Sequence, residues 1–271
     1  MTDVTQGDAF ARVDQSGDPA AFVQYLDAVA ALEAAKAYKQ RTYELLRLKA
    51  GDRVIDIGCG AGDDVRAIAE LVGETGRALG IDVSENMVAE ARRRAHGRSR
   101  AEFAIGDVHR LDYADGAFDA SRVDRALQHV ADPERALTEL VRVVRSGGRI
   151  VASEPDWETI VVDADDVALT RTILGVLVRG HVNPWIGRRL FPSLRSRGVL
   201  ELSVSGFTAT GTAFDLADAL LGLATAARTA REQGAIGAAE ETRWLDSLRD
   251  RSREGRFFAA ITVFVVAGTK P

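Results

Sequence analysis

Only one cysteine, Cys59, occurs among the 271 residues. A single thiol cannot form an internal disulfide, and it cannot supply a zinc site built from several cysteines. The sequence therefore suits reducing conditions, and we expect a cytoplasmic protein. We also expect no bound metal, because the acidic run Asp163–Asp166 directly precedes a helical pattern, where acids cap the helix and complement its dipole.

Long apolar runs and a basic surplus are missing as well. No stretch is apolar for the roughly 18 residues that a membrane-spanning helix needs, and the first residues lack a basic segment followed by an apolar one. The net charge is −5, with Lys and Arg scattered among Asp and Glu. Because binding to a phosphate backbone needs a concentrated basic surface, we expect neither a membrane span nor a nucleic-acid partner.

The composition that remains, 46% hydrophobic and 28% charged, suits one large globular domain. Between residues 52 and 153, short β-branched runs alternate with Ala-rich amphipathic stretches, the pattern of strand-helix units that form a parallel sheet. The expected strands are Arg53–Ile57, Ala78–Asp82, Ala101–Ile105, Phe118–Val123 and Gly148–Ser153.

Helical segments flank this region. Residues 20–48 predict one or two helices that can roof a site, and helices near 165–181 and 186–197 precede two long strands at 200–210 and 256–268. The segment 214–254 between those strands has helical spacing and is far longer than a hairpin loop. It is either a substrate lid or a cover for a sheet edge.

We therefore divide the chain into a helical cap (residues 1–50) and an α/β core (residues 51–271). The core carries its helical insertion at about residues 213–255.

The segment Val54–Gly62 ends a predicted strand in three glycines and opens a helix. Glycine has no Cβ, so such a turn lets backbone approach a ligand closely. A dinucleotide fingerprint requires its third glycine one residue after Gly62, where this sequence has Asp63. Asp63 and Asp64 would also repel a pyrophosphate at the helix N-terminus. The turn therefore favours a nucleoside without phosphates.

Further motifs accompany this turn in a fixed order. Asp56 lies two residues before the first glycine, and five more segments follow: Gly80–Met87, Ile105–Val108, Phe118-Asp119, Leu127–Val130 and Leu140–Arg149. With these motifs, roughly half of the sequence resembles the class I S-adenosylmethionine-dependent methyltransferases. Within that class it is similar to the small-molecule branch that includes ubiquinone and menaquinone C-methyltransferases and many enzymes of secondary metabolism.

The resemblance implies a fold and a cofactor. The fold is a Rossmann-like α/β sheet of seven mostly parallel strands with an antiparallel last strand, helices on both faces, a helical N-terminus and a helical insertion between the last two strands. The cofactor is S-adenosyl-L-methionine, with S-adenosyl-L-homocysteine as its product.

The resemblance also implies a cofactor-binding set. It places backbone at Gly58 and Gly60 beneath the methionine portion, Asp56 near the ammonium group and Asp82 on the ribose hydroxyls. The implied adenine contacts are Val83, Met87, Asp107 and Val108.

Some of these residues have a purely structural role as the alternative. Asp56 is otherwise a turn residue, Asp82 an N-cap neighbour and Met87 part of the core. Arg125, Tyr38 and Arg41 are candidates for the methionine carboxylate, with a solvated or structural role as the equal alternative.

Two candidate catalytic residues follow the fourth and fifth expected strands. His129 can act as a base on a hydroxyl or an acidic carbon, because imidazole titrates near neutral pH, yet relatives carry a histidine there without this role. Glu154, with Asp156, follows the fifth expected strand and either orients a polar acceptor, takes up a proton, or caps the next helix.

We predict methyl transfer to carbon, oxygen or nitrogen of a small, largely apolar metabolite, such as an isoprenoid, a quinone or another natural product, by a monomer or homodimer. The alternative is a protein of this fold that binds the cofactor but catalyses a different step, such as a cyclisation.

Overall fold

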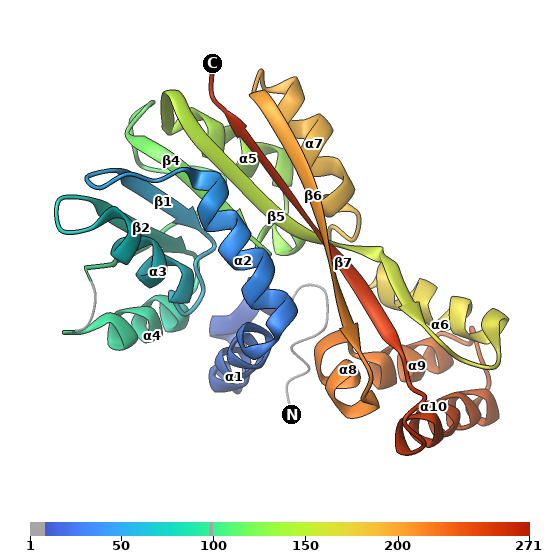
Figure 1. Ribbon diagram of the computed structural model, residues 1–271. Helices are drawn as coiled ribbons and strands as arrows, with labels where there is room; N and C mark the ends of the chain where they lie inside the picture. The colour runs from blue at the N-terminus through green and yellow to red at the C-terminus, as the bar shows by residue number, and fades with distance from the viewer. Residues whose placement is uncertain (1–8, 98–99) are drawn as a thin grey trace.

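A twisted seven-stranded sheet forms the centre of the protein in the computed structural model, which describes residues 9–97 and 100–271 (Figure 1). The strand order is β3-β2-β1-β4-β5-β7-β6, and β7 alone runs antiparallel to both of its neighbours. The predicted Rossmann-like fold is therefore confirmed. The strands are β1 (Arg53–Ile57), β2 (Arg77–Asp82), β3 (Glu102–Ile105), β4 (Phe118–Asp124), β5 (Val144–Val162), β6 (Leu200–Gly211) and β7 (Ala259–Thr269).

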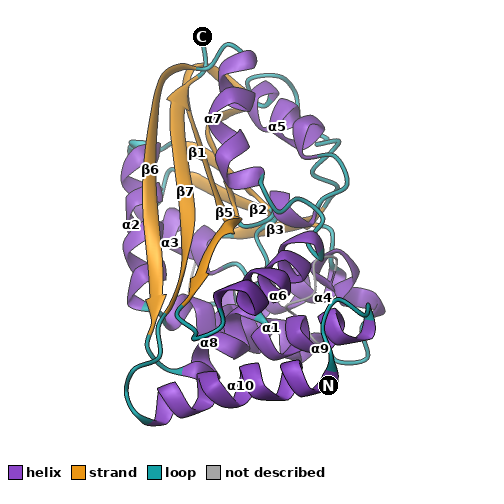
Figure 2. Ribbon diagram, turned by 90° about the vertical axis from the view of Figure 1, so that its right-hand side faces the viewer, coloured by secondary structure: helices purple, strands orange, loops and turns teal. Residues whose placement is uncertain are grey.

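Helices cover both faces of the sheet (Figure 2). Buried side chains of α2 (Glu33–Leu46), α3 (Asp63–Val72) and α4 (Glu85–Ala95) share one hydrophobic cluster with the sheet. Those of α5 (Pro133–Arg142) and α7 (Ile186–Ser196) share the cluster on the other face. Each cluster removes large aliphatic side chains from water, which is the main force that holds the three layers together.

Two helices begin at the capping residues that the sequence predicted. The Asp132 side chain accepts a hydrogen bond from the Arg135 amide at 2.9 Å, and Pro133 occupies the first turn of α5. Asp166 caps α6 (Val167–Arg179) in the same way, at 2.9 Å from the Leu169 amide. Within the acidic run, Asp166 therefore has the predicted capping role, whereas Asp163 and Asp165 pair with Arg251 of α10 (Ala238–Arg253).

Strand β5 is much longer than the sequence predicted. It continues past Ser153 to Val162, and its register with β7 shifts between Asp156 and Val161. Glu154 and Asp156 therefore lie inside the strand and are fully buried, which corrects their expected place on the rim of the sheet. Asp156 is tolerated there because Arg188 of α7 binds its carboxylate and the Glu158 amide donates to it at 3.2 Å.

The far ends of β5, β6 and β7 carry a second group of helices, visible at the lower right of Figure 1. We call this group the helical lobe; it contains α6, α8 (Phe214–Leu221), α9 (Leu223–Glu232) and α10 (Ala238–Arg253). The lobe has its own buried cluster, which includes Trp157 of β5 and Trp244 of α10. Three of its helices form the predicted insertion between the last two strands.

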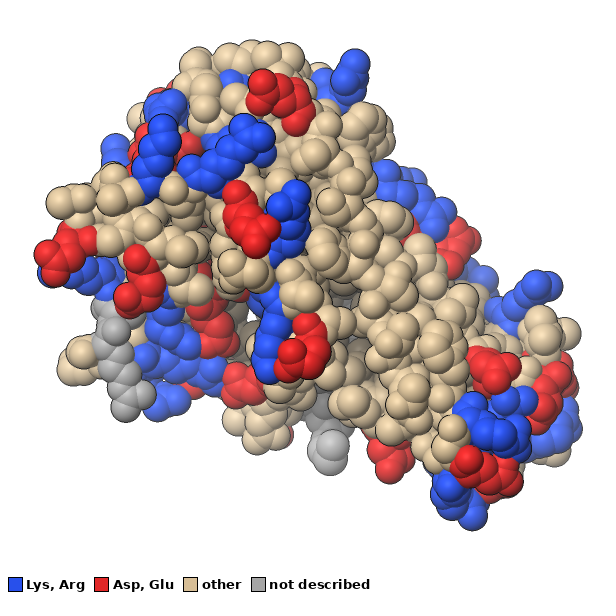
Figure 3. Space-filling model, viewed as in Figure 1, with Lys and Arg blue, Asp and Glu red and all other residues tan. Residues whose placement is uncertain are grey.

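The N-terminal segment supplies a short 3₁₀ helix, η1 (Ala9–Gln15), and α1 (Pro19–Ala31) before α2. Figure 1 shows α1 and α2 between the glycine-turn end of the sheet and the helical lobe. No helix in the described ranges has the length and apolar character that crossing a membrane requires. On the face shown in Figure 3, Lys and Arg alternate with Asp and Glu and do not gather into one stripe.

Candidate functional site

The glycine turn between β1 and α3 requires glycine for two separate reasons. Gly58 and Gly62 have φ values of +70° and +79°, a left-handed conformation that side chains disfavour. A Cβ at Gly58 would also lie 2.3 Å from the Ala126 Cβ, and one at Gly62 would lie 2.5 Å from the Phe103 ring. The turn can therefore follow the adjacent elements closely and leave open space above its backbone.

That space is a cavity of about 410 Å³. We call it the cofactor cavity. Its wall combines the glycine turn, the ends of β2, β3 and β4, and side chains from η1, α1 and α2. Nine of the residues predicted from the sequence line it: Gly58, Gly60, Asp82, Val83, Met87, Asp107, Val108, Arg125 and His129.

Two carboxylates mark one end of the cofactor cavity. Asp82 accepts hydrogen bonds from the Gly60 amide at 2.8 Å and the Ser84 amide at 3.0 Å, which fixes its orientation. Burial raises the pKa of Asp82, and these amides counteract that rise. Asp107 accepts from the His109 amide at 2.9 Å. Burial alone would raise the pKa of Asp107, but the His109 hydrogen bonds bring it below the ordinary value. Both carboxylates keep lone pairs for a ligand.

Four predicted residues lie outside the wall of the cofactor cavity. Arg41 is on the exposed side of α2, 2.9 Å from Glu44, so the structure does not support its predicted contact with the cofactor. Asp56 lies beneath the turn and pairs with Arg122 at 3.0 Å. Tyr38 lines a second cavity. Glu154 lies in β5, where its Oε1 accepts from the Leu127 amide at 2.6 Å, and burial raises its pKa to about 8.

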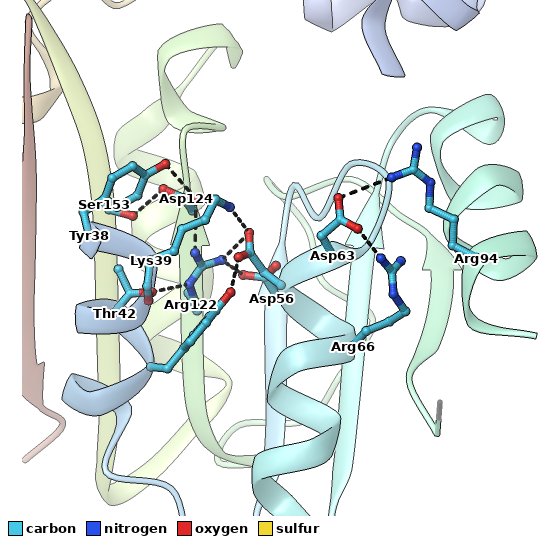
Figure 4. A network of polar contacts seen from close by, with 12 residues as sticks. Tyr38, Lys39, Thr42, Asp56, Asp63, Arg66, Arg94, Arg122, Asp124 and Ser153 are labelled. Carbon is cyan, nitrogen blue, oxygen red and sulfur yellow. Dashed lines mark hydrogen bonds and ion pairs between the residues drawn. The ribbon is translucent and has the colours of Figure 1, made fainter. Parts of the chain in front are cut away.

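A buried guanidinium, Arg122, holds together the elements around the cofactor cavity (Figure 4). It extends from β4 and is 0% exposed. Its nitrogens lie 3.0 Å from Asp56, 3.3 Å from Asp64 and 3.1 Å from Asp124. Its Nε also donates to the Thr42 hydroxyl of α2 at 3.0 Å. Side chains from α2, β1, α3 and the end of β4 therefore meet at one guanidinium.

Lys39 of α2 is the second cation of this network. It pairs with Asp64 and lies 3.0 Å from Asp124. Burial alone would raise the pKa of Asp64, but Arg122 and Lys39 lower it below the ordinary value. Hydroxyl groups complete the network, since Tyr43 donates to Asp64 and Ser153 donates to Asp124 at 2.6 Å.

The wall of the cofactor cavity carries a negative surplus, because it contains two cations, Lys39 and Arg125, and five carboxylates: Asp63, Asp64, Asp82, Asp107 and Asp124. Two of these carboxylates, Asp64 and Asp124, belong to the Arg122 network. A surplus of this sign in a poorly hydrated place favours a cationic ligand over an anionic one. Neither Arg122 nor Lys39 was among the predicted site residues, although an arginine in the middle of a central strand is itself a signal of a buried ion pair.

A second cavity of about 120 Å³ adjoins the first. We call it the apolar cavity. It lies among α1, α2, the β6–β7 pair and α8, and its wall includes Leu32, Phe207, Leu220 and Val263. The two cavities share Val29 and Arg125 as wall residues. The two cavities therefore meet at these two side chains.

The fold and the cofactor cavity together define a class I methyltransferase-type site. A glycine turn follows the first strand, a carboxylate ends the second, and the charge balance suits a cationic nucleoside without phosphates.

Comparisons with known proteins agree. Residues 48–175 match the model of a family described as a methyltransferase domain. The uncharacterized 37.1 kDa protein in transposon TN4556 of Streptomyces fradiae is 40% identical, over 90% of this chain and 70% of that protein. Demethylmenaquinone methyltransferase of Shouchella clausii is 34% identical, but over only 51% of this chain and 59% of that enzyme.

Among solved structures, the fold resembles geranyl diphosphate C-methyltransferase from Streptomyces coelicolor A3(2), which was crystallised with S-adenosyl-L-homocysteine. The TM-score is 0.55 at 16% identity, over 88% of this chain and 76% of that one. Residues 48–175 therefore form a methyltransferase domain of the class I type, which uses S-adenosyl-L-methionine as its cofactor.

The residues present fit this cofactor. The cofactor cavity runs along the glycine turn, and Asp82 and Asp107 offer carboxylate acceptors to hydroxyl and amine donors. The negative surplus of the cavity wall suits a sulfonium cation.

Replacing Arg122 tests the network. Arg122→Met should lower the free energy of unfolding by about 3–5 kcal/mol, because three buried carboxylates lose their shared partner. Urea denaturation would measure the change. Arg145→Met is the matched control, since Arg145 pairs with Asp119 at the surface, where an ion pair contributes about 0–1 kcal/mol. Equal effects of the two substitutions would contradict the structural role of Arg122.

Replacing Asp82 tests the nucleoside assignment. Asp82→Ala should weaken binding of S-adenosylhomocysteine by roughly 10- to 100-fold, because a carboxylate loses paired hydrogen bonds to the ligand. Isothermal titration calorimetry measures the affinity, with the exposed Asp112→Ala as control. Unchanged affinity in Asp82→Ala would remove the assignment.

Proposed function

We propose that the protein transfers a methyl group from S-adenosyl-L-methionine to carbon, oxygen or nitrogen of a small, largely apolar metabolite. The observation that carries the proposal is the apolar cavity next to the cofactor cavity, with Val29 and Arg125 in both walls. A pocket built mainly from aliphatic and aromatic side chains binds a small apolar ligand well and offers little to an extended polymer.

The proposed role of the residues that line the cofactor cavity is to hold and orient the cofactor. The bound cofactor supplies an electrophilic methyl group. Backbone at Gly58 and Gly60 would support the amino-acid portion, Asp82 would accept from the ribose hydroxyls, and Asp107 with the Val108 amide would hold the adenine; all of them line the cavity. Val83 and Met87 flank that ring. Such fixed contacts favour transfer chiefly by proximity, since they hold the two reactants in one orientation.

His129 is the proposed base where the acceptor must lose a proton. It lies in the short 3₁₀ helix η2 (Leu127–His129) and lines the cofactor cavity. Its ring is 5.0 Å from the Phe10 ring of η1, so an aromatic side chain limits water on one side. Glu154 does not reach the cavity; it holds η2 through the Leu127 amide, and we propose that it positions His129.

The helices around the apolar cavity are proposed to enclose the acceptor. Residues 1–50 would act as the cap, through Tyr25 of α1 and Tyr38 of α2, and the insertion at about 213–255 as the lid, through Leu216 and Leu220 of α8. Closure around the acceptor would exclude water from the transfer step.

The names of two similar proteins support an isoprenoid or quinone acceptor, since one acts on demethylmenaquinone and the other on geranyl diphosphate. We propose a monomer or homodimer in the cytoplasm, and the single buried thiol, Cys59, suits a reducing compartment.

An acceptor panel tests the function. The wild-type protein should form S-adenosylhomocysteine only when an apolar acceptor, such as a prenylated hydroquinone, is added, and mass spectrometry should show a product heavier by one methyl group in place of a hydrogen. Tight cofactor binding without transfer across the whole panel would contradict the proposal and favour a non-methylating reaction such as a cyclisation.

The His129→Ala variant tests the base. Its turnover number should fall by about 100-fold or more with an acceptor that loses a proton, while its affinity for S-adenosylhomocysteine should stay within about threefold of wild type. Steady-state kinetics and calorimetry provide the two readouts. An unchanged turnover number would leave His129 with no part in proton transfer.

A further inference from the structure

Arg125 is the only charged side chain that lines the apolar cavity within the described residues. The rest of that wall is aliphatic or aromatic, apart from the hydroxyls of Tyr25, Tyr38 and Thr210 and the indole nitrogen of Trp157, which donates to Gln128. A guanidinium stays charged at any pH that the protein meets. A fixed positive charge therefore borders a poorly hydrated pocket, where a charge without a counter-ion is unfavourable.

The cation has no carboxylate partner of its own. Within residues 9–97 and 100–271, Arg125 forms no ion pair. The nearest acid in the chain, Asp124, is already bound by Lys39 at 3.0 Å and Arg122 at 3.1 Å, and it accepts from Ser153 at 2.6 Å. Arg125 is thus the third cation beside a network whose carboxylates are engaged by the other two.

The charged end of Arg125 is turned toward the apolar cavity. Its Nη2 lies 3.3 Å from the Tyr25 hydroxyl, and its guanidinium carbon lies 5.8 Å from the centre of the Tyr25 ring. It also interacts with the Tyr38 hydroxyl. Tyr25 and Tyr38 both line the apolar cavity and neither lines the cofactor cavity. The two rings hold the guanidinium without neutralising it.

The backbone places Arg125 at this junction in a strained conformation. Its φ is +56°, a left-handed value that is unusual for any residue with a side chain. The Arg125 amide donates to the Ser153 carbonyl at 2.8 Å, which anchors the residue to β5 directly after β4 ends. Strain of this kind persists where the surrounding structure fixes it, and it often occurs at ligand sites.

We propose that Arg125 selects the acceptor: the natural acceptor is an apolar molecule with one acidic oxygen, as a carboxylate or an ionised enol or phenol, and that oxygen pairs with Arg125. The inference rests on the proposed function, because it names the substrate class of the same site. An anionic oxygen supplies the partner that the guanidinium lacks, and the apolar body fills the rest of the cavity. The position of Arg125 in both walls brings that oxygen to the end of the acceptor nearest the cofactor.

In the sequence analysis, Arg125 was a candidate for a different role, in which it binds the methionine carboxylate of the cofactor and not the acceptor. The two assignments predict opposite effects of one substitution. If Arg125 serves the acceptor, removing its charge changes acceptor selection and spares the cofactor; if it serves the cofactor, the reverse holds.

Paired probes test the proposal by binding alone. The probes are octanoate, 4-phenylbutyrate and 2-naphthoate, each compared with its neutral amide, in the presence of saturating S-adenosylhomocysteine. Wild-type protein should bind at least one of the carboxylates about 10-fold more tightly than the matching amide, because a charge-assisted pair with arginine is lost in the amide. Calorimetry measures both affinities and the separate affinity for S-adenosylhomocysteine.

Arg125→Gln should abolish the preference and keep the affinity for S-adenosylhomocysteine within about threefold, since glutamine keeps the Cβ and the backbone constraint but not the charge. Arg125→Lys should retain part of the preference. Arg253→Gln, which changes an exposed arginine of α10, is the matched control and should behave as wild type.

Two results would overturn the proposal. One is a wild-type protein without preference for any carboxylate, whether or not the amides bind. The other is an Arg125→Gln variant that loses affinity for S-adenosylhomocysteine while its preference for the carboxylate persists. Either result leaves the methyl-transfer test untouched, because turnover with neutral apolar acceptors is measured separately. Conversely, an anion preference in a protein that methylates nothing would refute the proposed function and leave the role of Arg125 standing.

Discussion

The ion pairs of Arg122 constrain the rest of the site. Burying a guanidinium costs several kcal/mol unless strong partners surround it, and here three carboxylates from β1, α3 and the end of β4 do so. Those carboxylates can stay ionised only because Arg122 and Lys39 face them. The glycine turn, the start of α3 and helix α2 are therefore held at fixed distances by charge as well as by apolar packing. A network of this kind favours one arrangement of the elements, since small displacements leave a buried charge without a partner.

The regular part of the fold could be predicted from the sequence. Strands β1 to β4 are short, apolar and separated by clear helix signals such as Asp132-Pro133, so local pattern was sufficient. The length of β5 could not be predicted in this way. The residues Glu154-Pro155-Asp156 look like the end of a strand because acids and proline are uncommon inside a sheet. They remain in the strand because distant groups satisfy them, namely the Leu127 amide and the Arg188 guanidinium.

In the candidate site, too, some features could be predicted from the sequence and others could not. Residues that follow strands at motif spacing, such as Asp82 and Asp107, were assigned from the family resemblance, and both line the cofactor cavity because the ends of parallel strands meet at one edge of the sheet. Helix α2 was different. Its sequence predicts a helix but does not determine which side faces the sheet. Arg41 was therefore a candidate cofactor contact, whereas the structure places Lys39 in the wall of the cofactor cavity and Arg41 on the exposed side. Helical rotation is set by packing against the core, which a single sequence does not reveal.

Val29 and Arg125 are shared by the walls of the two cavities, and this arrangement has a thermodynamic consequence. A ligand in either cavity that shifts one of these side chains alters the wall that the other ligand meets. By linkage, the free energy with which the cofactor favours the acceptor must equal the free energy with which the acceptor favours the cofactor. Substitutions at Val29 or Arg125 would therefore change the coupling between the affinities for the two ligands, even where the substituted side chain touches only one of them.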